Sequence, residues 1–190
     1  MLSARASELE RDLPFAVVRQ LLEGVDDRFF TGAAALAAPV LREGSSEGEA
    51  QAVHGLYWLT ANLAAERPLL VLVDDAHWAD LPSLRWLAYL AQRLDGLAAG
   101  VIVAARPGEP MLDHLAASAS FELLEPRDLS AEAVGRLIGA DAEPGFVAAC
   151  ARVTGGNPFL LGGAADARGA AVRRRARLSR GDDRPRRPRA

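Results

Sequence analysis

The stretch LLVLVDDAHWAD, residues 69–80, decides the fold. Five apolar residues, 69–73, follow Pro68 and lead directly into Asp74 and Asp75. A short apolar run bounded in this way is typical of a strand that is buried on both faces, at the centre of a parallel α/β sheet. A simpler interpretation stays open at this point, in which two solvated acids stand at the tip of a buried strand.

Asp74 and Asp75 stand where a ligand is expected, because ligands of parallel α/β sheets bind beyond the carboxyl ends of the strands. An apolar strand that ends in aspartate is the Walker B pattern, in which the carboxylate holds Mg²⁺ beside the phosphates of a nucleotide. In this interpretation Asp74 serves the metal, and Asp75 faces the attacking water. The alternative is a pair of acids that bind no metal.

Apolar periodicity predicts strands that alternate with helices along most of the chain. The predicted strands are residues 2–6, 69–73, 101–105 and 121–124. The predicted helices are residues 15–23, 50–65, 81–94, 109–119, 131–138 and 144–153. This alternation predicts an α/β fold, in which a doubly wound parallel sheet flanked by helices is followed by a helical segment.

Two further polar residues stand at the ends of predicted elements. Asp80 precedes the helix that starts at Leu81 or Pro82, so we expect it to cap that helix rather than to act in catalysis. Arg106 follows the strand 101–105 and would share a sheet edge with Asp74 if the two strands are neighbours. There it could contact a terminal phosphate, or it could be a surface arginine paired with Glu109.

The glycine-rich turn GGNP, residues 155–158, also has two interpretations. Two glycines and a proline specify a helix C-cap followed by a sharp turn. The functional interpretation places this turn against the base of a nucleotide. The loop residues His77 and Trp78 are most simply a hydrogen-bonded histidine and a cover for the end of the strand.

Three segments in this order resemble one known family. They are LLVLVDDAHWADLPSLRWLAYLAQRL at 69–94, VIVAARPGE at 101–109 and TGGNPFLL at 154–161. Together they resemble the ATPase module of the STAND class of AAA-related P-loop NTPases, and within it the large ATP-binding LuxR-type transcriptional regulators. The resemblance covers about residues 1–161, and the three segments together are far more specific than any one of them.

The resemblance implies a role for each matching residue. Asp74 and Asp75 would be the Walker B acids, Arg106 would be the sensor arginine, and Pro158 would lie near the adenine or at the hinge to a helical domain. The implied cofactors are ATP or ADP with Mg²⁺. Relatives of this kind are thought to rest with ADP and to oligomerise with ATP and an inducer, after which separate C-terminal domains act on DNA.

The chain departs from that family before its first predicted strand. No segment matches the phosphate loop G-x-x-x-x-G-K-[ST], and the chain contains no lysine. That loop binds phosphates through backbone N–H groups and its lysine. In the family it lies before the position that corresponds to Met1, so we expect this chain to be a fragment that binds nucleotide weakly.

The chain also departs from the family after Leu161. Residues 163–190 contain ten arginines and three aspartates, a balance of +7, so residues 1–162 carry −10 of the chain's net charge of −3. This tail has few large apolar residues, and we expect it to be disordered. It would be either an arm that attracts nucleic-acid phosphates or the product of a frameshift or truncated gene, and we favour the second explanation.

The expected organisation is therefore an incomplete NTPase core at 1–128, the beginning of a helical lid domain at 129–161, and an arginine-rich tail at 162–190. The leading hypothesis is a STAND-type ATPase module with impaired nucleotide binding. The alternatives are an inactive interaction module that associates with full-length relatives, and nucleic-acid binding through the tail. No apolar run is long enough to span a bilayer, and we expect a cytoplasmic protein without membrane contact.

Overall fold

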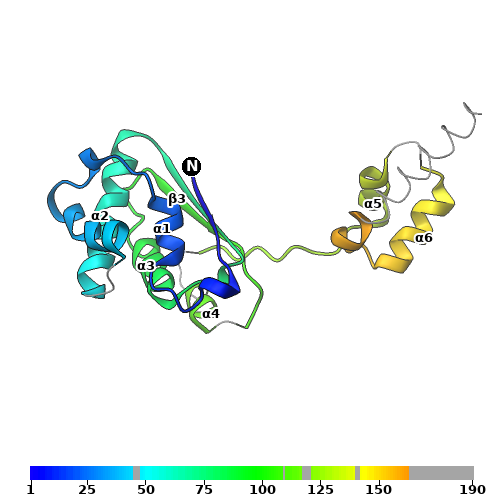
Figure 1. Cartoon of the computed structure of the whole chain (residues 1–190). Coiled ribbons are helices and arrows are strands. Elements are labelled where there is room, and N and C mark those ends of the chain that lie inside the picture. Colours follow the sequence, from blue (N-terminus) through cyan, green and yellow to red (C-terminus); the bar gives the residue numbers. More distant parts are fainter. Residues whose placement is uncertain (45–47, 109, 117–120, 140–141, 163–190) are drawn as a thin grey trace, which may run out of the picture. The chain divides into compact units, whose positions relative to one another are not determined.

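The computed structural model describes residues 1–44, 48–108, 110–116, 121–139 and 142–162. The chain divides into two compact units, Met1–Leu123 and Leu124–Ala190. Figure 1 labels elements of both units. The expected tail at 162–190 lies, except for its first residue, outside the described residues.

Unit 1 is built on a parallel sheet of three strands. The strands are β1 (Leu2–Arg5), β2 (Leu69–Asp74) and β3 (Ala99–Val103). Their order in the sheet is β1-β2-β3, so β2 is central. Val71 of β2 stands beside Leu2 on one side and Val101 on the other. The predicted α/β fold with a parallel sheet is confirmed, and β2 coincides with the predicted central strand.

Helices connect these strands. The longer ones in unit 1 are α1 (Ala16–Leu22), α2 (Glu49–Glu66), α3 (Leu81–Ala91) and α4 (Pro110–Ala116). The short turns of helix are η1 (Glu8–Glu10), η2 (Asp27–Phe29), η3 (Gly32–Ala37), η4 (Pro39–Glu43) and η5 (Ala76–Trp78). Among the described residues, no helix combines the length and hydropathy that a membrane span requires.

In the part of the chain that the structure describes, helices cover the sheet on one face only, which corrects the prediction that the central strand is buried on both faces. Along β2, Leu69, Val71 and Val73 are buried, whereas Leu70 and Asp74 are exposed. Alternate residues of a strand point to opposite faces. Figure 1 shows α1, α2 and α3 on the same side of the strands. The prediction failed because an apolar residue such as Leu70 suggests burial, but the sequence does not show whether a helix packs on that face of the strand.

Close backbone contact fixes α2 against η3. Gly55 lies in the middle of α2, and a Cβ atom built on it would stand 2.5 Å from the backbone N of Ala37 and 2.7 Å from the carbonyl carbon of Leu36. Real Cβ atoms do not approach so closely, so only glycine fits here. The alanine-rich segment of η3 therefore packs directly on the helix that precedes the central strand.

A single buried carboxylate joins the beginnings of two helices of unit 1. Asp80 is 1% exposed and accepts the Ser83 N–H at 2.9 Å, which confirms the predicted cap of α3. The same carboxylate accepts the N–H groups of Phe15 at 2.7 Å and Val17 at 3.2 Å, at the start of α1. Phe15 has a φ of 58°, which is rare for a bulky residue. This backbone turns the Phe15 N–H toward Asp80 while the aromatic ring is buried in the core.

The described part of unit 2 contains α5 (Ala131–Ile138), α6 (Pro144–Thr154) and a further helical segment at 158–162. Val134, Cys150 and Leu161 form its small core. Ser130 caps α5, since its Oγ accepts the Ala133 N–H at 3.2 Å. Cys150 is a buried free thiol and belongs to this core.

The prediction of a strand at 121–124 is wrong, because the structure has no strand there. Leu123 and Leu124 are exposed, while Phe121 packs partly against the core of unit 1. A β-strand requires a neighbour with which to exchange backbone hydrogen bonds. The sheet ends at β3 without reaching this segment, so its apolar character does not produce a strand.

We predict that Asp80→Ala lowers the free energy of unfolding of unit 1 by about 3 kcal/mol or more. The substitution removes a helix cap and leaves three buried N–H groups without an acceptor, and each effect costs about 1 kcal/mol or more. Urea unfolding followed by tryptophan fluorescence measures this, because Trp58, Trp78 and Trp86 all lie in unit 1. The control is Asp26→Ala, which removes an exposed cap of η2 and should cost less than about 1 kcal/mol. Equal losses in the two variants would contradict this role of Asp80.

Candidate functional site

Two aspartates mark the carboxyl end of the central strand. Asp74 is the last residue of β2 and its side chain is 51% exposed. Asp75 follows in the left-handed conformation, with φ 51° and ψ 34°, and its N–H donates to Asp74 Oδ1 at 2.9 Å. The chain therefore turns sharply after β2. The two carboxylates lie at the carboxyl end of the central strand, where the sequence predicts a site.

Arg5 holds both aspartates and was not among the predicted site residues. Its guanidinium donates to Asp75 Oδ2 through Nε at 2.8 Å, and one terminal nitrogen also lies 2.8 Å from that oxygen. Nε is 3.9 Å from Asp74 Oδ2. The hydrogen bond and charge of Asp75, and then the charge of Asp74, raise the pKa of Arg5 above its ordinary value. The strand register could have identified Arg5 as a site residue, because Arg5 pairs with Asp74 once β1 and β2 are known to be parallel neighbours.

The backbone of Arg106 lies at the same carboxyl-terminal end of the strands. Ala104 donates its N–H to Val73 O at 2.9 Å, which carries the pairing of β2 and β3 to the end of the strands. Arg106 follows two residues later, and its backbone N–H donates to His77 Nδ1 at 3.4 Å. The structure therefore places the backbone of Arg106 beside the loop that follows Asp75. The alternative partner, Glu109, lies outside the described residues.

The two loop residues after Asp75 support this edge. His77 Nε2 is buried, and no described residue is its hydrogen-bond partner. The rings of His77 and Trp78 are 5.1 Å apart, and the guanidinium of Arg11 lies 6.0 Å from the centre of the Trp78 ring. The hydrogen bond that His77 Nδ1 accepts from the Arg106 N–H agrees with the prediction of a hydrogen-bonded histidine. Trp78 packs partly against the core of unit 1, and its role as a cover for the strand end stays a prediction.

Pro158 belongs to unit 2, whereas the two aspartates belong to unit 1. Gly155 ends α6 with φ 62°, and Gly156 follows with φ 84°. A Cβ atom on Gly156 would lie 2.3 Å from Leu129 O, so this position also requires glycine. Asn157 Oδ1 then accepts the Phe159 N–H at 2.9 Å. The GGNP segment is the predicted helix C-cap and turn, and its proposed contact with a nucleotide base stays a prediction.

The fit of a magnesium nucleotide to these residues is partial. Asp74 suits Mg²⁺, because it is half exposed and its Oδ2 accepts no hydrogen bond from a described residue. Asp75 suits it less well, since Arg5 occupies Oδ2. The described residues contain no group of three or more potential metal ligands. The first N–H groups of α1 and α3, which could face phosphates, are directed to Asp80.

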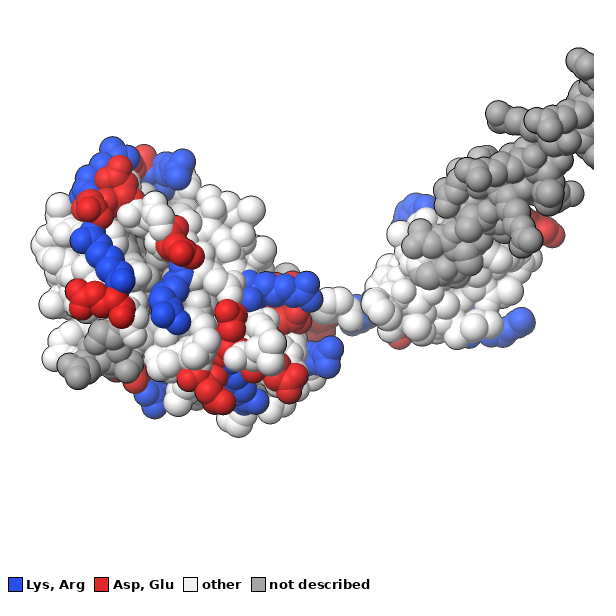
Figure 2. All heavy atoms as spheres, in the orientation of Figure 1, with Lys and Arg blue, Asp and Glu red and all other residues white. Residues whose placement is uncertain are grey.

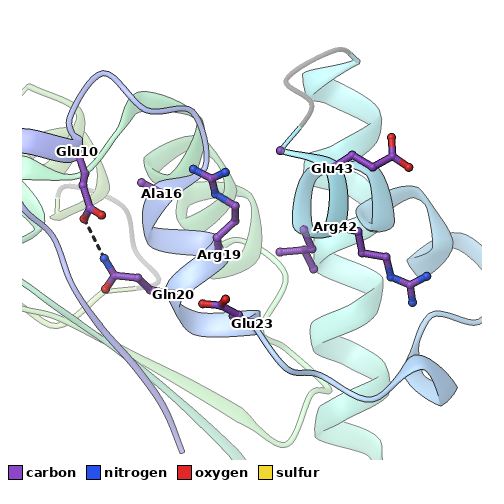
Figure 3. Close-up of a pocket in the computed structure, with 9 residues that line it drawn as sticks. Glu10, Ala16, Arg19, Gln20, Glu23, Arg42 and Glu43 are labelled. Carbon is purple, nitrogen blue, oxygen red and sulfur yellow. Dashed lines mark hydrogen bonds between the residues drawn. The ribbon is translucent and has the colours of Figure 1, made fainter.

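A separate cavity of about 490 Å³ lies between α1 and η4. Figure 3 shows Arg19 and Glu23 on the α1 wall, with Arg42 and Glu43 on the opposite wall. Glu10 accepts a hydrogen bond from Gln20 at its rim, at 3.0 Å. Neither candidate aspartate lines this cavity. On the face of unit 1 in view in Figure 2, acidic and basic side chains are interspersed. This cavity of mixed charge is therefore distinct from the sheet edge that carries Asp74.

Comparison with known proteins identifies no relative. No family model, curated protein or solved structure matches the chain. The resemblance to STAND ATPases therefore rests on the quoted motifs alone.

We predict that Asp75→Asn changes the free energy of unfolding by less than about 1 kcal/mol, whereas Asp75→Val lowers it by about 1–2 kcal/mol. Asparagine tolerates the left-handed backbone and valine does not, while the exposed pair with Arg5 contributes little. Urea unfolding followed by tryptophan fluorescence distinguishes the two variants. A large loss in Asp75→Asn would mean that the ion pair, and not the backbone, is the stabilising element.

Proposed function

We propose that unit 1 is the magnesium-binding half of a nucleoside triphosphate site in a STAND-type ATPase module of a signalling or transcriptional regulator. The observation that carries the proposal is that Asp74, Asp75 and Arg106 all lie at the carboxyl ends of neighbouring parallel strands. The two aspartates end the central strand, and Arg106 follows the neighbouring parallel strand. Parallel α/β sheets bind ligands beyond the carboxyl ends of their strands.

Each residue has a role that its chemistry allows. Asp74 would hold Mg²⁺, which when bound neutralises charge on phosphate oxygens. Asp75 would orient the attacking water once Arg5 has released its carboxylate. Arg106 would contact the terminal phosphate, for which a guanidinium is suited. The ion pair of Arg5 with Asp75 makes the arrangement a resting state, because it occupies the carboxylate that faces the water.

The proposal includes weak binding of nucleotide by this chain. Phosphates are usually held by backbone N–H groups and a lysine. The chain has no lysine, and Asp80 accepts N–H groups at the start of α1 and α3. Asp74 and Asp75 add negative charge that repels the nucleotide in the absence of Mg²⁺. Affinity should therefore depend on Mg²⁺ and remain in the millimolar range, on the order of −4 kcal/mol.

We predict that MgATP at millimolar concentration shifts the backbone NMR signals of residues 74–77 and 104–106, and that ATP with excess chelator does not. Asp74→Ala should abolish these shifts. The matched control is Asp12→Ala, which removes another exposed acid of unit 1 and should leave them intact. Shifts confined to other residues would contradict the site. Micromolar binding that Asp74→Ala abolishes, measured by calorimetry, would contradict the weak affinity.

A second candidate function is an interaction module that associates with full-length relatives. The observation that favours it is the open edge of the sheet at β3, which has no neighbouring strand among the described residues. Open edges promote association between chains. Size-exclusion chromatography with and without a full-length STAND relative tests this function, and it should show a complex. Identical elution in the two runs would count against it.

A further inference from the structure

The outer edge of β3 presents a row of backbone hydrogen-bonding groups. At one end of the ladder Leu69 donates its N–H to Ala98 O at 2.8 Å, and at the other Ala104 donates to Val73 O at 2.9 Å. Even-numbered residues of this segment therefore face β2. Along a paired strand, successive residues direct their N–H and C=O groups to opposite sides. The residues that face outward are Ala99, Val101 and Val103.

This edge lacks the protection that isolated edge strands usually carry. Residues 97–105 contain no charged residue and no proline, both of which natural proteins use to block edges. The opposite edge of the sheet differs. In β1, Arg5 brings a charge, and its backbone N–H donates to Gln20 Oε1 at 3.2 Å. Among the described residues, the contrast favours β3, and not β1, as the edge that can pair with another strand.

We propose that a second copy of this chain pairs with β3, antiparallel and with Val101 of both copies on the two-fold axis. Outward-facing residues must then pair with outward-facing residues, so Val101 pairs with Val101 and Ala99 with Val103. This register uses all three outward-facing residues of each copy, whereas a shift by two residues loses a pair. The result is a six-stranded sheet in which both β3 edges are closed.

The side chains of β3 are self-complementary in this register. Gly100 of one copy lies opposite Ile102 of the other, on the face that no described helix covers. Ile102 is 51% exposed. A Cβ atom on Gly100 would meet only Leu70 Cδ1, at 3.6 Å, so the space above Gly100 is open. Each Ile102 side chain therefore covers the other copy's Gly100 and contacts Leu70, which is 36% exposed in one copy alone.

The proposed pairing is confined to β3, because the chain turns just before it, where Leu97 donates its N–H to Leu94 O at 2.9 Å. The proposal rests on the second candidate function and names its partner as a second copy. It does not depend on nucleotide binding, and its failure would leave pairing with a full-length relative open to its own test.

The first test is light scattering coupled to size-exclusion chromatography on the full chain, which should show dimers that dissociate on dilution. Ile102→Lys should raise the dimer dissociation constant at least about tenfold by replacing an apolar contact with charge. The matched control is Ser3→Lys, since Ser3 and Ile102 flank Leu72 on the same face of the sheet, one on each edge strand. A control variant that weakens the dimer equally, or a wild-type chain that is monomeric at every concentration, would overturn the proposal.

Two further variants test the register. Gly100→Val fits the isolated chain, because its Cβ makes ordinary contact with Leu70, but it fills the space that Ile102 of the second copy requires. It should weaken the dimer about tenfold or more while circular dichroism stays unchanged. In a Cys150→Ala background, Val101→Cys should form a disulfide-linked dimer on mild oxidation, since paired Cα atoms are about 5.5 Å apart.

Ala99→Cys in the same background is the control for the disulfide. Its own symmetry mate lies four residues farther along the strand, about 13 Å away, so it should not form a disulfide. Cross-linking of Ala99→Cys in preference to Val101→Cys would overturn the register. Indiscriminate cross-linking of both variants, or large aggregates without a dimer, would overturn the proposal of a specific pair.

Discussion

The arrangement of unit 1 depends on the buried carboxylate of Asp80. Its oxygens accept N–H groups from α1 and α3, so one side chain fixes where two helices begin. Ser83 adds a second link, because its hydroxyl accepts the Val18 N–H at 3.2 Å. Both helices pack on the sheet at its covered face, and Asp80 is only five residues beyond Asp75. The position of the candidate site therefore follows from a residue that has no chemical role in it.

The same constraint limits what the site can bind. Helix N-termini attract phosphates when their N–H groups are free. Here the Asp80 carboxylate accepts the N–H groups of Phe15, Val17 and Ser83. Its negative charge therefore lies between the N-termini of α1 and α3. The described polar groups at this end of the strands include two aspartates, His77 and the arginines Arg5 and Arg106. This chemistry suits a metal ion and the terminal phosphate more than it suits the whole triphosphate.

One face of the sheet is not covered by any described helix. Leu70, Leu72 and Ile102 lie on it, while the residues between them are packed against helices. A monomer with an apolar face and an unprotected β3 edge has two reasons to associate, and the two surfaces meet at Ile102. Closure by a two-fold axis satisfies the edge of both copies at once. An open-ended pairing through β1 is disfavoured, because Gln20 and Arg5 already occupy that edge.

The sequence by itself determined the three strands of the sheet, most of the longer helices and several of their ends. The apolar run before Asp74, the cap at Asp80 and the glycines at 155–156 are local signals, because each depends on the backbone within a few residues. Tertiary structure decided which elements became neighbours, and no local pattern contains that information. It placed Arg5 on Asp75, left Leu70 without a covering helix, and kept residues 121–124 from forming a strand. The physical reason is that ion pairs, burial and sheet hydrogen bonds each need a partner from a distant part of the chain.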